Sequence, residues 1–323
     1  MHLRQSALGR SHHHKTQSRR ATAPARRLTI SSSTRMAPAA AAETVAAPLN
    51  GGAATDEEKA RAVAIFRRTW DVYTKVVEHD YMSHVLLSDA LSKDMQVCHG
   101  GGADASSSFS LIDLGCGGAD AFAAMLRRAP QLAARINSYT GVDLSDIALA
   151  HARANMIGGP VQGGFPDVRS SAPADGALPS SSSAPSTQFV EADMVTYAES
   201  LPAQSADVVV AAFALHHLTP DLKARTCAAV AKALKPGGTF YYQDVWMLPT
   251  ETREAYLARY RTLLDSWDLS EQQRNFIWDH VSAHDFPATQ REIAALPFFG
   301  SCEVVAEDGG PHALLRLTGP KLE

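Results

Sequence analysis

The sequence predicts an α/β fold in which a doubly wound, mostly parallel sheet ends in an antiparallel hairpin. Short apolar runs alternate with helical patterns between residues 109 and 244, and such alternation favours parallel strands joined by right-handed crossovers. Two further apolar runs near the end of the chain are separated only by the short segment Glu307–Pro311. That spacing predicts a hairpin that closes the sheet.

Helical patterns precede the first strand. Apolar side chains from Glu57 to Val77 follow near-helical spacing, and a second helical stretch covers Tyr81 to Gln96. Residues 99–107 are rich in Gly and Ser and predict a flexible joint. We therefore divide the chain into a disordered leader (residues 1–50), N-terminal helices (residues 51–104) and a sheet domain (residues 105–323).

Five strands are predicted in the sheet, and helices connect most of them. The strands are Phe109–Leu114, Tyr139–Asp143, Phe189–Ala192, Asp207–Ala212 and Thr239–Asp244, and the helices are Ala121–Arg128, Ile147–Met156 and Asp221–Leu234. Ser145 is expected to cap the second helix, and Thr219 to cap the third, where a proline takes the first helical position. Residues 157–187, rich in Gly, Pro, Ser and Ala, predict a disordered insertion, with a substrate lid as the alternative.

A helical cap is expected at residues 249–297, after the fifth strand. It contains helices over Thr252–Ser266 and Glu271–His284 and a short helix to Leu296. Ser270 with Gln273 three residues later predicts a capping box at the second of these helices. The runs Cys302–Ala306 and Ala313–Leu317 then form the predicted hairpin.

The charges are distributed unevenly. Residues 1–42 contain 8 of the 30 Lys and Arg residues and none of the 34 acidic residues. This composition is typical of an organellar transit peptide, and its Ala and Ser content favours the chloroplast over the mitochondrion. The alternatives are a disordered tail, or a start at Met36 that would leave the protein in the cytoplasm. The run from His12 to His14 is expected to be a compositional accident and not a metal site.

The rest of the chain excludes several classes of protein. It holds 22 basic and 34 acidic residues, a net charge of −12, which argues against nucleic-acid binding. No run of about 18 apolar residues is present, so no membrane span is expected. The four cysteines are widely spaced, which excludes a disulfide scaffold and a zinc ribbon. We expect no metal site, and the oligomeric state is not predicted.

A glycine turn, Gly115-Cys116-Gly117-Gly118, follows the first predicted strand. Such a turn lets a ligand approach the backbone at the carboxyl end of the strand. Asp113 precedes the turn, and Asp120 stands where a dinucleotide motif has its third glycine. Carboxylates on both sides of the turn disfavour a pyrophosphate and favour a ligand with an ammonium and a sulfonium group. S-adenosylmethionine is therefore preferred over NAD.

Five segments, in order, resemble motifs of the class I S-adenosylmethionine-dependent methyltransferases. They are Asp113-Leu-Gly-Cys-Gly-Gly118, Gly141-Val-Asp143-Leu-Ser, Glu191-Ala-Asp193-Met194, Phe213-Ala-Leu-His-His217-Leu and Leu234-Lys-Pro-Gly-Gly238-Thr-Phe. The resemblance covers about residues 105–248 and implies a Rossmann-like sheet with S-adenosylmethionine as cofactor. Asp120 departs from the glycine common at its position, which puts the packing of the following helix in doubt.

The resemblance implies a cofactor contact at nine positions: Asp113, Gly115, Cys116, Gly117, Asp143, Leu144, Asp193, Met194 and Phe213. The residues from 113 to 117 would hold the amino-acid part of the cofactor, and Asp143 the ribose hydroxyls. Leu144 and Met194 would flank the adenine, and Asp193 would accept its amino group. Phe213 would lie near the sulfonium. The alternatives are loop capping for Asp113 and Asp143 and a helix cap for Asp193.

Methyl transfer is an in-line displacement that needs a base only if the acceptor must lose a proton. His216 is the first candidate for a base or substrate contact, and Asp244 the second, with a structural role as the alternative. Neighbours on an extended chain point in opposite directions, so at most one of His216 and His217 is expected to face the substrate. Tyr81 and His84, in the N-terminal helices, are candidate substrate-binding residues.

Three functions remain open at this point. A methyltransferase acting on a small molecule is favoured, because helices before the sheet and after its fifth strand can enclose one. A protein methyltransferase is the second reading. The third is a methyltransferase-like assembly or regulatory factor that binds the cofactor without turnover.

Overall fold

The structure is a computed structural model that describes residues 72–100, 108–157 and 186–321. Contacts divide the chain into Met1–Ala46 and Ala47–Glu323, and every described residue belongs to the second part. The predicted leader, most of the first helix, residues 101–107 of the predicted joint (99–107) and nearly all of the insertion at residues 157–187 lie outside the described residues. The prediction of a joint is wrong for its first two residues, because His99 and Gly100 belong to the helix α2 (His84–Gly100). No described helix is long and apolar enough to cross a membrane.

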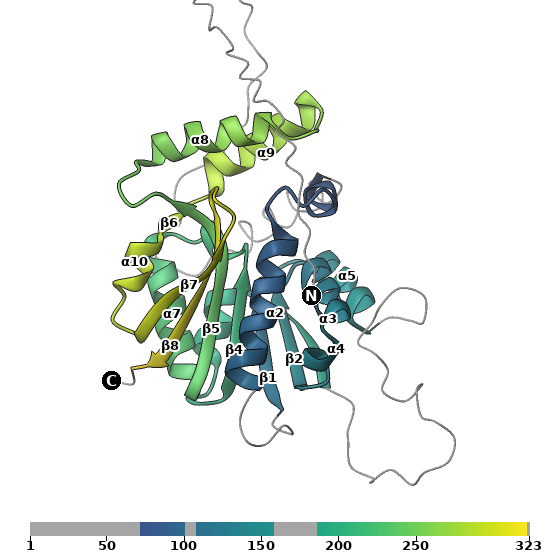
Figure 1. The fold of residues 1–323 in the computed structure, drawn as a ribbon, viewed down its shortest axis with the longest axis vertical. Coiled ribbons are helices and arrows are strands. Elements are labelled where there is room, and N and C mark those ends of the chain that lie inside the picture. Colours follow the sequence, from purple (N-terminus) through teal and green to yellow (C-terminus); the bar gives the residue numbers. More distant parts are fainter. Residues whose placement is uncertain (1–71, 101–107, 158–185, 322–323) are drawn as a thin grey trace, which may run out of the picture. The chain divides into compact units, whose positions relative to one another are not determined.

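The sheet has the strand order β3-β2-β1-β4-β5-β8-β7 (Figure 1). Its strands are β1 (Phe109–Leu114), β2 (Ile136–Asp143), β3 (Ser186–Glu191), β4 (Ala206–Ala212), β5 (Leu234–Met247), β7 (Phe299–Glu307) and β8 (His312–Pro320). The first five pair in parallel, and β8 pairs antiparallel with both β5 and β7. The predicted fold class and terminal hairpin are therefore confirmed.

The helices precede, connect and follow these strands. They are α2 (His84–Gly100), α3 (Asp120–Arg128), α4 (Pro130–Ala133), α5 (Asp146–Ile157), α6 (Met194–Ser200), α7 (Pro220–Ala233), α8 (Arg253–Asp265), α9 (Glu271–His284) and α10 (Gln290–Ala294). The prediction that α2 begins at Tyr81 is wrong by three residues. Asp80 and Ser83 have φ angles of 54° and 55°, and this left-handed backbone ends the preceding helix and delays the next. The short elements α4, α6 and β6 (Ala288–Thr289, parallel to β5) were not predicted.

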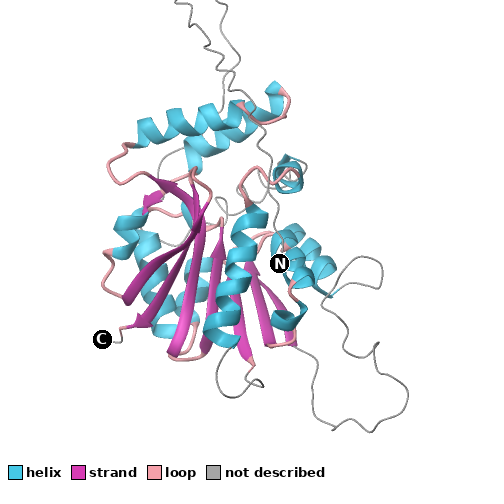
Figure 2. Cartoon of the chain, in the orientation of Figure 1, coloured by secondary structure: helices cyan, strands magenta, loops and turns pink. Residues whose placement is uncertain are grey.

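Helices cover both faces of the sheet (Figure 2), and an apolar core lies against each face. Leu111 of β1 belongs to the core beneath α2, α3 and α5, whereas its neighbour Ile112 belongs to the core beneath α6 and α7. The same alternation separates Tyr241 from Phe240 in β5. Because successive side chains of a strand point to opposite faces, the apolar runs of the sequence supply both cores.

A third apolar cluster joins α8 and α9 to the end of β5. It includes Tyr256, Trp267, Val281 and Val245. The capping box of Ser270 and Gln273 at α9 is confirmed. The predicted cap of α5 is also present, since Ser145 Oγ accepts a hydrogen bond from the Ala148 amide at 3.2 Å. The predicted Thr219 cap is wrong, because this side chain makes no capping bond and only the proline marks the start of α7.

Candidate functional site

The glycine turn lies where β1 ends and the strand order reverses between β1 and β4, the usual position of a ligand in such sheets. Gly115 and Gly117 have φ angles of +71° and +52°. A Cβ atom on Gly115 would lie 2.4 Å from Cβ of Ala214, whereas one on Gly117 would have no atom within 4 Å. Gly115 is therefore required by packing, and Gly117 borders open space in which a ligand can approach the backbone.

Asp143, at the end of β2, stabilises this turn through hydrogen bonds. Its Oδ2 accepts a hydrogen bond from the Gly117 amide, and its Oδ1 accepts one from the Ser145 amide, both at 2.9 Å. Burial raises the pKa of Asp143, and these two amides act in the opposite direction. A carboxylate has about four acceptor sites, so two remain for the hydroxyls of a ribose. The geometry fits the role implied for Asp143.

Asp113 is the most enclosed of the carboxylates around the glycine turn. It is buried and accepts a hydrogen bond from the Tyr139 hydroxyl at 2.9 Å. Burial raises its pKa to about 7, against the opposing effect of Tyr139 and with a smaller contribution from the charge of Asp143. A nearby cation would favour its ionised form. The side chain is thus suited to an ammonium or sulfonium ligand.

Asp120 has a partner that accounts for its departure from glycine. Asn155 of α5 donates from Nδ2 to Asp120 Oδ1 and to the Gly118 carbonyl, both at 2.8 Å. The doubt about packing at this helix is thereby resolved, because the carboxylate and the turn are bonded to the same amide group.

Tyr73 is a site residue that sequence reasoning missed. Burial raises its pKa, and so do the charges of Asp120, Asp143 and Asp113. Its phenol is therefore close to the carboxylates around the glycine turn. In the sequence it is only one apolar position of a helical pattern, so nothing in the spacing distinguishes it.

The residues implied for adenine lie at the same edge of the sheet. Met194, the first residue of α6, places its Cε 3.6 Å from where a Gly115 Cβ would be. Asp193 caps α6 through Oδ1, which accepts from the amide and hydroxyl of Thr196. The alternative reading of Asp193 as a helix cap is thus observed, and its Oδ2 is outside these bonds. Leu144 directly follows Asp143, and Cys116 is buried within the turn.

Phe213, at the end of β4, has an uncommon backbone conformation for a large residue, with φ of 53°. Its ring packs against His84, at a centroid distance of 4.9 Å. Both ring nitrogens of His84 are buried without a hydrogen-bond partner, and burial lowers its pKa to about 4. A neutral imidazole therefore faces the residue implied to lie near the sulfonium. Tyr81 instead stacks on Trp267, with ring centroids 4.8 Å apart.

The two predicted catalytic residues are paired. Asp244 Oδ1 lies 2.5 Å from His216 Nδ1, and Asp244 Oδ2 accepts a hydrogen bond from the His216 amide at 2.9 Å. Burial would lower the pKa of His216, but the charges of Asp244 and Asp285 outweigh it and the pKa is raised. The pair orients the imidazole so that Nε2 remains for another contact.

The expectation that His216 and His217 point in opposite directions is wrong. Residues Leu215–His217 form a 3₁₀ turn and not an extended segment. The two rings lie 3.9 Å apart, and both approach the carboxylate of Asp285. Neighbouring side chains in a 3₁₀ turn do not alternate as they do in a strand. The sequence did not indicate this turn, because the apolar run of β4 continues into it.

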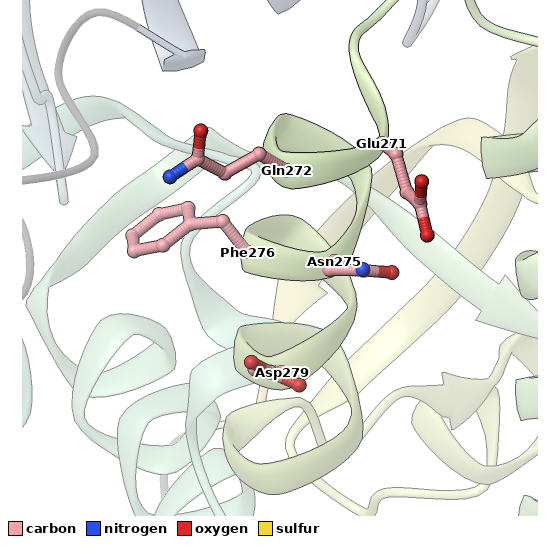
Figure 3. Close-up of a pocket in the computed structure, with 5 residues that line it drawn as sticks. All are labelled: Glu271, Gln272, Asn275, Phe276 and Asp279. Carbon is pink, nitrogen blue, oxygen red and sulfur yellow. The ribbon is translucent and has the colours of Figure 1, made fainter.

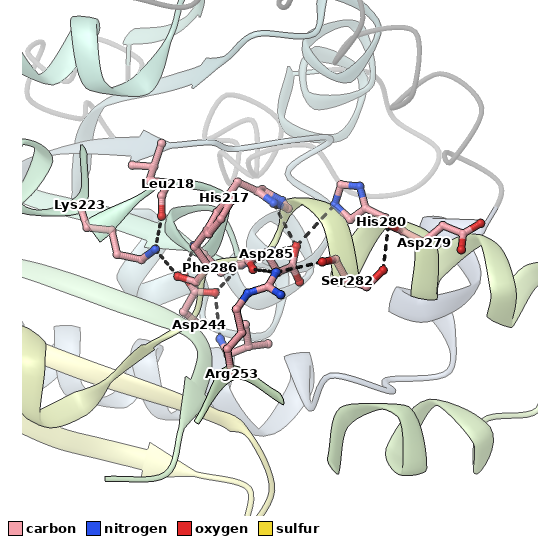
Figure 4. Close-up of polar contacts among 12 residues, drawn as sticks. His217, Leu218, Lys223, Asp244, Arg253, Asp279, His280, Ser282, Asp285 and Phe286 are labelled. Atoms are coloured by element: carbon pink, nitrogen blue, oxygen red, sulfur yellow. Dashed lines mark hydrogen bonds and ion pairs between the residues drawn. The ribbon is translucent and has the colours of Figure 1, made fainter. Parts of the chain in front are cut away.

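Asp285, which ends α9, is a second residue that the sequence did not single out. Its Oδ1 lies 3.4 Å from His217 Nδ1, 3.8 Å from His216 Nε2 and 3.7 Å from His280 Nε2 (Figure 4). Burial would raise its pKa, but His216 and His217 hold it below its ordinary value. We call His216, His217, His280 and Asp285 the histidine–aspartate cluster.

Backbone contacts fix this cluster between the cap and the sheet. Arg253 donates to the carbonyls of Ser282 and Asp285 (Figure 4). The Phe286 amide donates to the His216 carbonyl at 2.7 Å. Lys223 is buried and donates to the carbonyls of Leu218 and Phe286, and burial lowers its pKa to about 8.

The cluster and the glycine turn belong to one site. Burial raises the pKa of Asp143, and the charge of His217 opposes this effect, so these two side chains are within electrostatic range across the ends of β2 and β4. A surface hollow lies elsewhere, along one face of α9 (Figure 3). It is lined by Glu271, Gln272, Asn275, Phe276 and Asp279. None of these belongs to the turn or the cluster, and we assign the site to the strand ends.

Comparison with known proteins supports this assignment. Residues 112–240 match the family model described as a methyltransferase domain. That range begins within β1 and ends within β5, so it contains the glycine turn, Asp143 and the 3₁₀ turn. Comparison with curated proteins gives no match.

Solved structures of methyltransferases share part of the fold at low identity. The mitomycin 7-O-methyltransferase has 14% identity and a TM-score of 0.49, and the match covers 80% of this chain and 60% of that one. The magnesium protoporphyrin IX methyltransferase of Synechocystis PCC 6803, solved with bound S-adenosylhomocysteine, has 12% identity and a TM-score of 0.49, with coverages of 81% and 100%. The assignment rests on the family model and the glycine turn, and not on these structures.

Proposed function

Since the domain at residues 112–240 belongs to the class I S-adenosylmethionine-dependent methyltransferases, we propose that this chain transfers a methyl group to a small-molecule acceptor. The observation that carries the proposal is the arrangement around Gly117. Its amide is bonded to Asp143, the space beside it is open, and the buried Asp113 lies on β1, two residues before the turn begins. This arrangement suits a cationic nucleoside.

When bound, S-adenosylmethionine supplies a methyl group on a cationic sulfonium. Asp143 would accept the ribose hydroxyls with the lone pairs that Gly117 and Ser145 leave free. Asp113 and the backbone of the turn would bind the amino-acid part. Met194, Leu144 and Asp193 would surround the adenine, and Phe213 would place the sulfonium towards the acceptor. All of these side chains are presented by the carboxyl ends of parallel strands or by the residues that follow them.

The acceptor would lie between Phe213 and the histidine–aspartate cluster. His216 and Asp285 are buried, whereas the side chains of His217 and His280 are 39% and 32% exposed. Within the described part of the chain, an acceptor would therefore reach the cluster from the side of these two histidines. Such a restricted entry favours a small molecule over a folded protein. The acidic charge of residues 43–323 disfavours a nucleic acid.

Two measurements test the proposal. Calorimetry of the full chain should show binding of S-adenosylmethionine, and NAD should not bind. Incubation with an organellar metabolite extract should then release S-adenosylhomocysteine. Binding without release from the metabolite fraction, but with release from the protein fraction, would identify a protein methyltransferase. Binding without any release would identify a regulatory factor, and the absence of binding would refute the proposal.

The location of the protein is a separate proposal, based on the composition of residues 1–50. We expect these residues, fused to a fluorescent protein, to direct it to the chloroplast. Accumulation in mitochondria or the cytoplasm would exclude this location.

A further inference from the structure

We infer that His216, His217 and Asp285 form a binding site for a divalent first-row transition metal ion, for which Zn²⁺ is the best fit. This departs from the sequence analysis, which expected no metal site. The site consists of ligand atoms Nε2 of His216, Nδ1 of His217 and Oδ1 of Asp285, which all lie within 4.8 Å of one another.

Two of the three ligand separations are close to those around a tetrahedral ion. Ligand atoms bound to zinc at about 2.0–2.1 Å lie roughly 3.3–3.4 Å from one another. Asp285 Oδ1 is 3.4 Å from His217 Nδ1 and 3.8 Å from His216 Nε2. All three ligand atoms lie within 4.8 Å of one another, so side-chain movements that draw the two imidazoles together would complete the geometry. Two imidazoles and one carboxylate favour zinc over magnesium, which prefers oxygen ligands.

A second observation points to a missing ligand. Asp285 Oδ1 is buried and has no hydrogen-bond partner, although three imidazole nitrogens surround it. Nδ1 of His280 is likewise buried without a partner. A buried carboxylate oxygen that has ion-pair contacts of 3.4–3.8 Å but no hydrogen bond is incompletely satisfied. An ion between the imidazoles and Asp285 would satisfy this oxygen and explain why the rings approach it without forming hydrogen bonds.

The surroundings of the three ligands also suit a cation. Asp244 accepts from Nδ1 of His216, and this carboxylate–histidine pairing is typical of metal ligands because it fixes the tautomer that leaves Nε2 unprotonated. Two carboxylates, Asp244 and Asp285, face the imidazoles, whereas the cations Lys223 and Arg253 direct their hydrogen bonds to backbone carbonyls.

Three protein ligands leave the fourth position of a tetrahedral ion open, which is the usual arrangement in catalytic zinc sites. That position would face His280 and the entry side. A hydroxyl or thiol bound there would lose its proton more easily, so His216 would be a ligand and not a base. This last step rests on the proposed function, whereas the existence of the site does not.

The test is a Co²⁺ and Zn²⁺ titration of the metal-free full chain. The run from His12 to His14 can itself bind metal ions, so these three residues are replaced by Gln in every sample. One equivalent of Co²⁺ should give the intense visible absorption of a tetrahedral site, and Zn²⁺ should abolish it. D285N and H217Q should weaken Zn²⁺ binding at least about 100-fold, and D244N about 10–100-fold. H79Q is the matched control and should bind as the parent does, because His79 is exposed and outside the cluster.

Circular dichroism of each variant establishes that it is folded. If D285N does not fold, H217Q decides, because His217 is the most exposed of the ligands. Weak absorption typical of six-coordinate Co²⁺, or equal Zn²⁺ affinity in the parent chain and H217Q, would overturn the inference. Calorimetry with S-adenosylmethionine is independent of this readout. A chain that binds the cofactor but no metal would refute this inference alone, and the reverse result would refute the proposed function alone.

Discussion

Nδ1 of His216 and Oδ1 of Asp244 lie 2.5 Å apart, although one follows β4 and the other lies within β5. The two strands pair in parallel, with Ala212 opposite Gln243. The backbone register therefore brings the two side chains together at one edge of the sheet. This geometry predicts how substitutions and pH change cofactor binding and stability.

Removing the carboxylate of Asp143 should weaken cofactor binding about tenfold or more. D143A loses charged hydrogen bonds worth about 1.5–3 kcal/mol and releases the Gly117 amide. Calorimetry with S-adenosylmethionine measures the effect. E199A is the control, since Glu199 forms an exposed ion pair with Arg225 and should leave affinity unchanged. Equal affinities in D143A and E199A would contradict the site assignment.

Cofactor affinity should rise with pH between about 6 and 8. The pKa of Asp113 is about 7 in the free protein, and a cationic ligand binds better when this carboxyl is ionised. D113N should remove the rise of cofactor affinity that comes from ionisation of Asp113. Y139F should move this rise to higher pH, because the Tyr139 hydroxyl favours the ionised form of Asp113. Calorimetry at several pH values provides the test. A dependence that is identical in the parent chain and D113N would exclude Asp113.

The same carboxyl should affect stability in the opposite direction. A pKa that is raised on folding means that the folded chain holds this proton more tightly than the unfolded chain. Stability relative to D113N is therefore greatest below pH 3.8, the ordinary pKa, and is lost as pH rises through about 7. Urea unfolding of both chains at pH 5 and pH 8 should show this difference without the cofactor. A relative stability that increases with pH would contradict it.

Alanine at the two turn glycines should have different effects. G117A keeps a φ of +52° in open space, so it should cost only the left-handed strain of about 1–2 kcal/mol while reducing cofactor affinity. G115A adds a contact of 2.4 Å with Ala214 and should destabilise the fold by more. Thermal unfolding compares the two. A more stable G115A would show that the turn does not pack against Ala214.

Replacing His84 by phenylalanine should show whether this residue contributes to acceptor binding or only to the folded structure. The nitrogens of His84 form no hydrogen bond, and Nδ1 has only a 3.9 Å contact with Asp80, so H84F should leave the free energy of unfolding unchanged or raise it. If His84 contacts the acceptor, KM for the acceptor should rise. L86A provides a comparison for kinetics, because Leu86 is 46% exposed on the same helix. An unchanged KM in H84F would assign His84 to packing alone.

The sequence allowed the sheet and the glycine turn to be predicted because their signals are local. Apolar runs fix the strands, and Gly115 and Gly117 stand directly after the first of them. The paired parallel strands then bring Asp143 to the turn, as the motif resemblance implied. The catalytic candidates His216 and Asp244 also came from positions at strand ends, and their pairing follows from strand register.

The other site residues depend on contacts between distant segments. Asp285 and His280 reach the site only because α9 packs beneath α8 and its end is bonded to Arg253 and to the His216 carbonyl. Tyr73 likewise comes close to the carboxylates of the turn from a segment that is distant in the sequence. Periodicity describes which face of a helix is apolar, but it does not state which strand end that helix covers.

The bond between the Phe286 amide and the His216 carbonyl has a consequence for the timing of a catalytic cycle. His216 and His217 lie in the 3₁₀ turn that follows β4, whereas Asp285 directly follows α9 of the helical cap. Moving the helical cap to admit or release a compound would pull the carboxylate of Asp285 away from both imidazoles. A metal ion bound by all three side chains would oppose this movement. Exchange of compounds would then be slowest when the metal ion is bound.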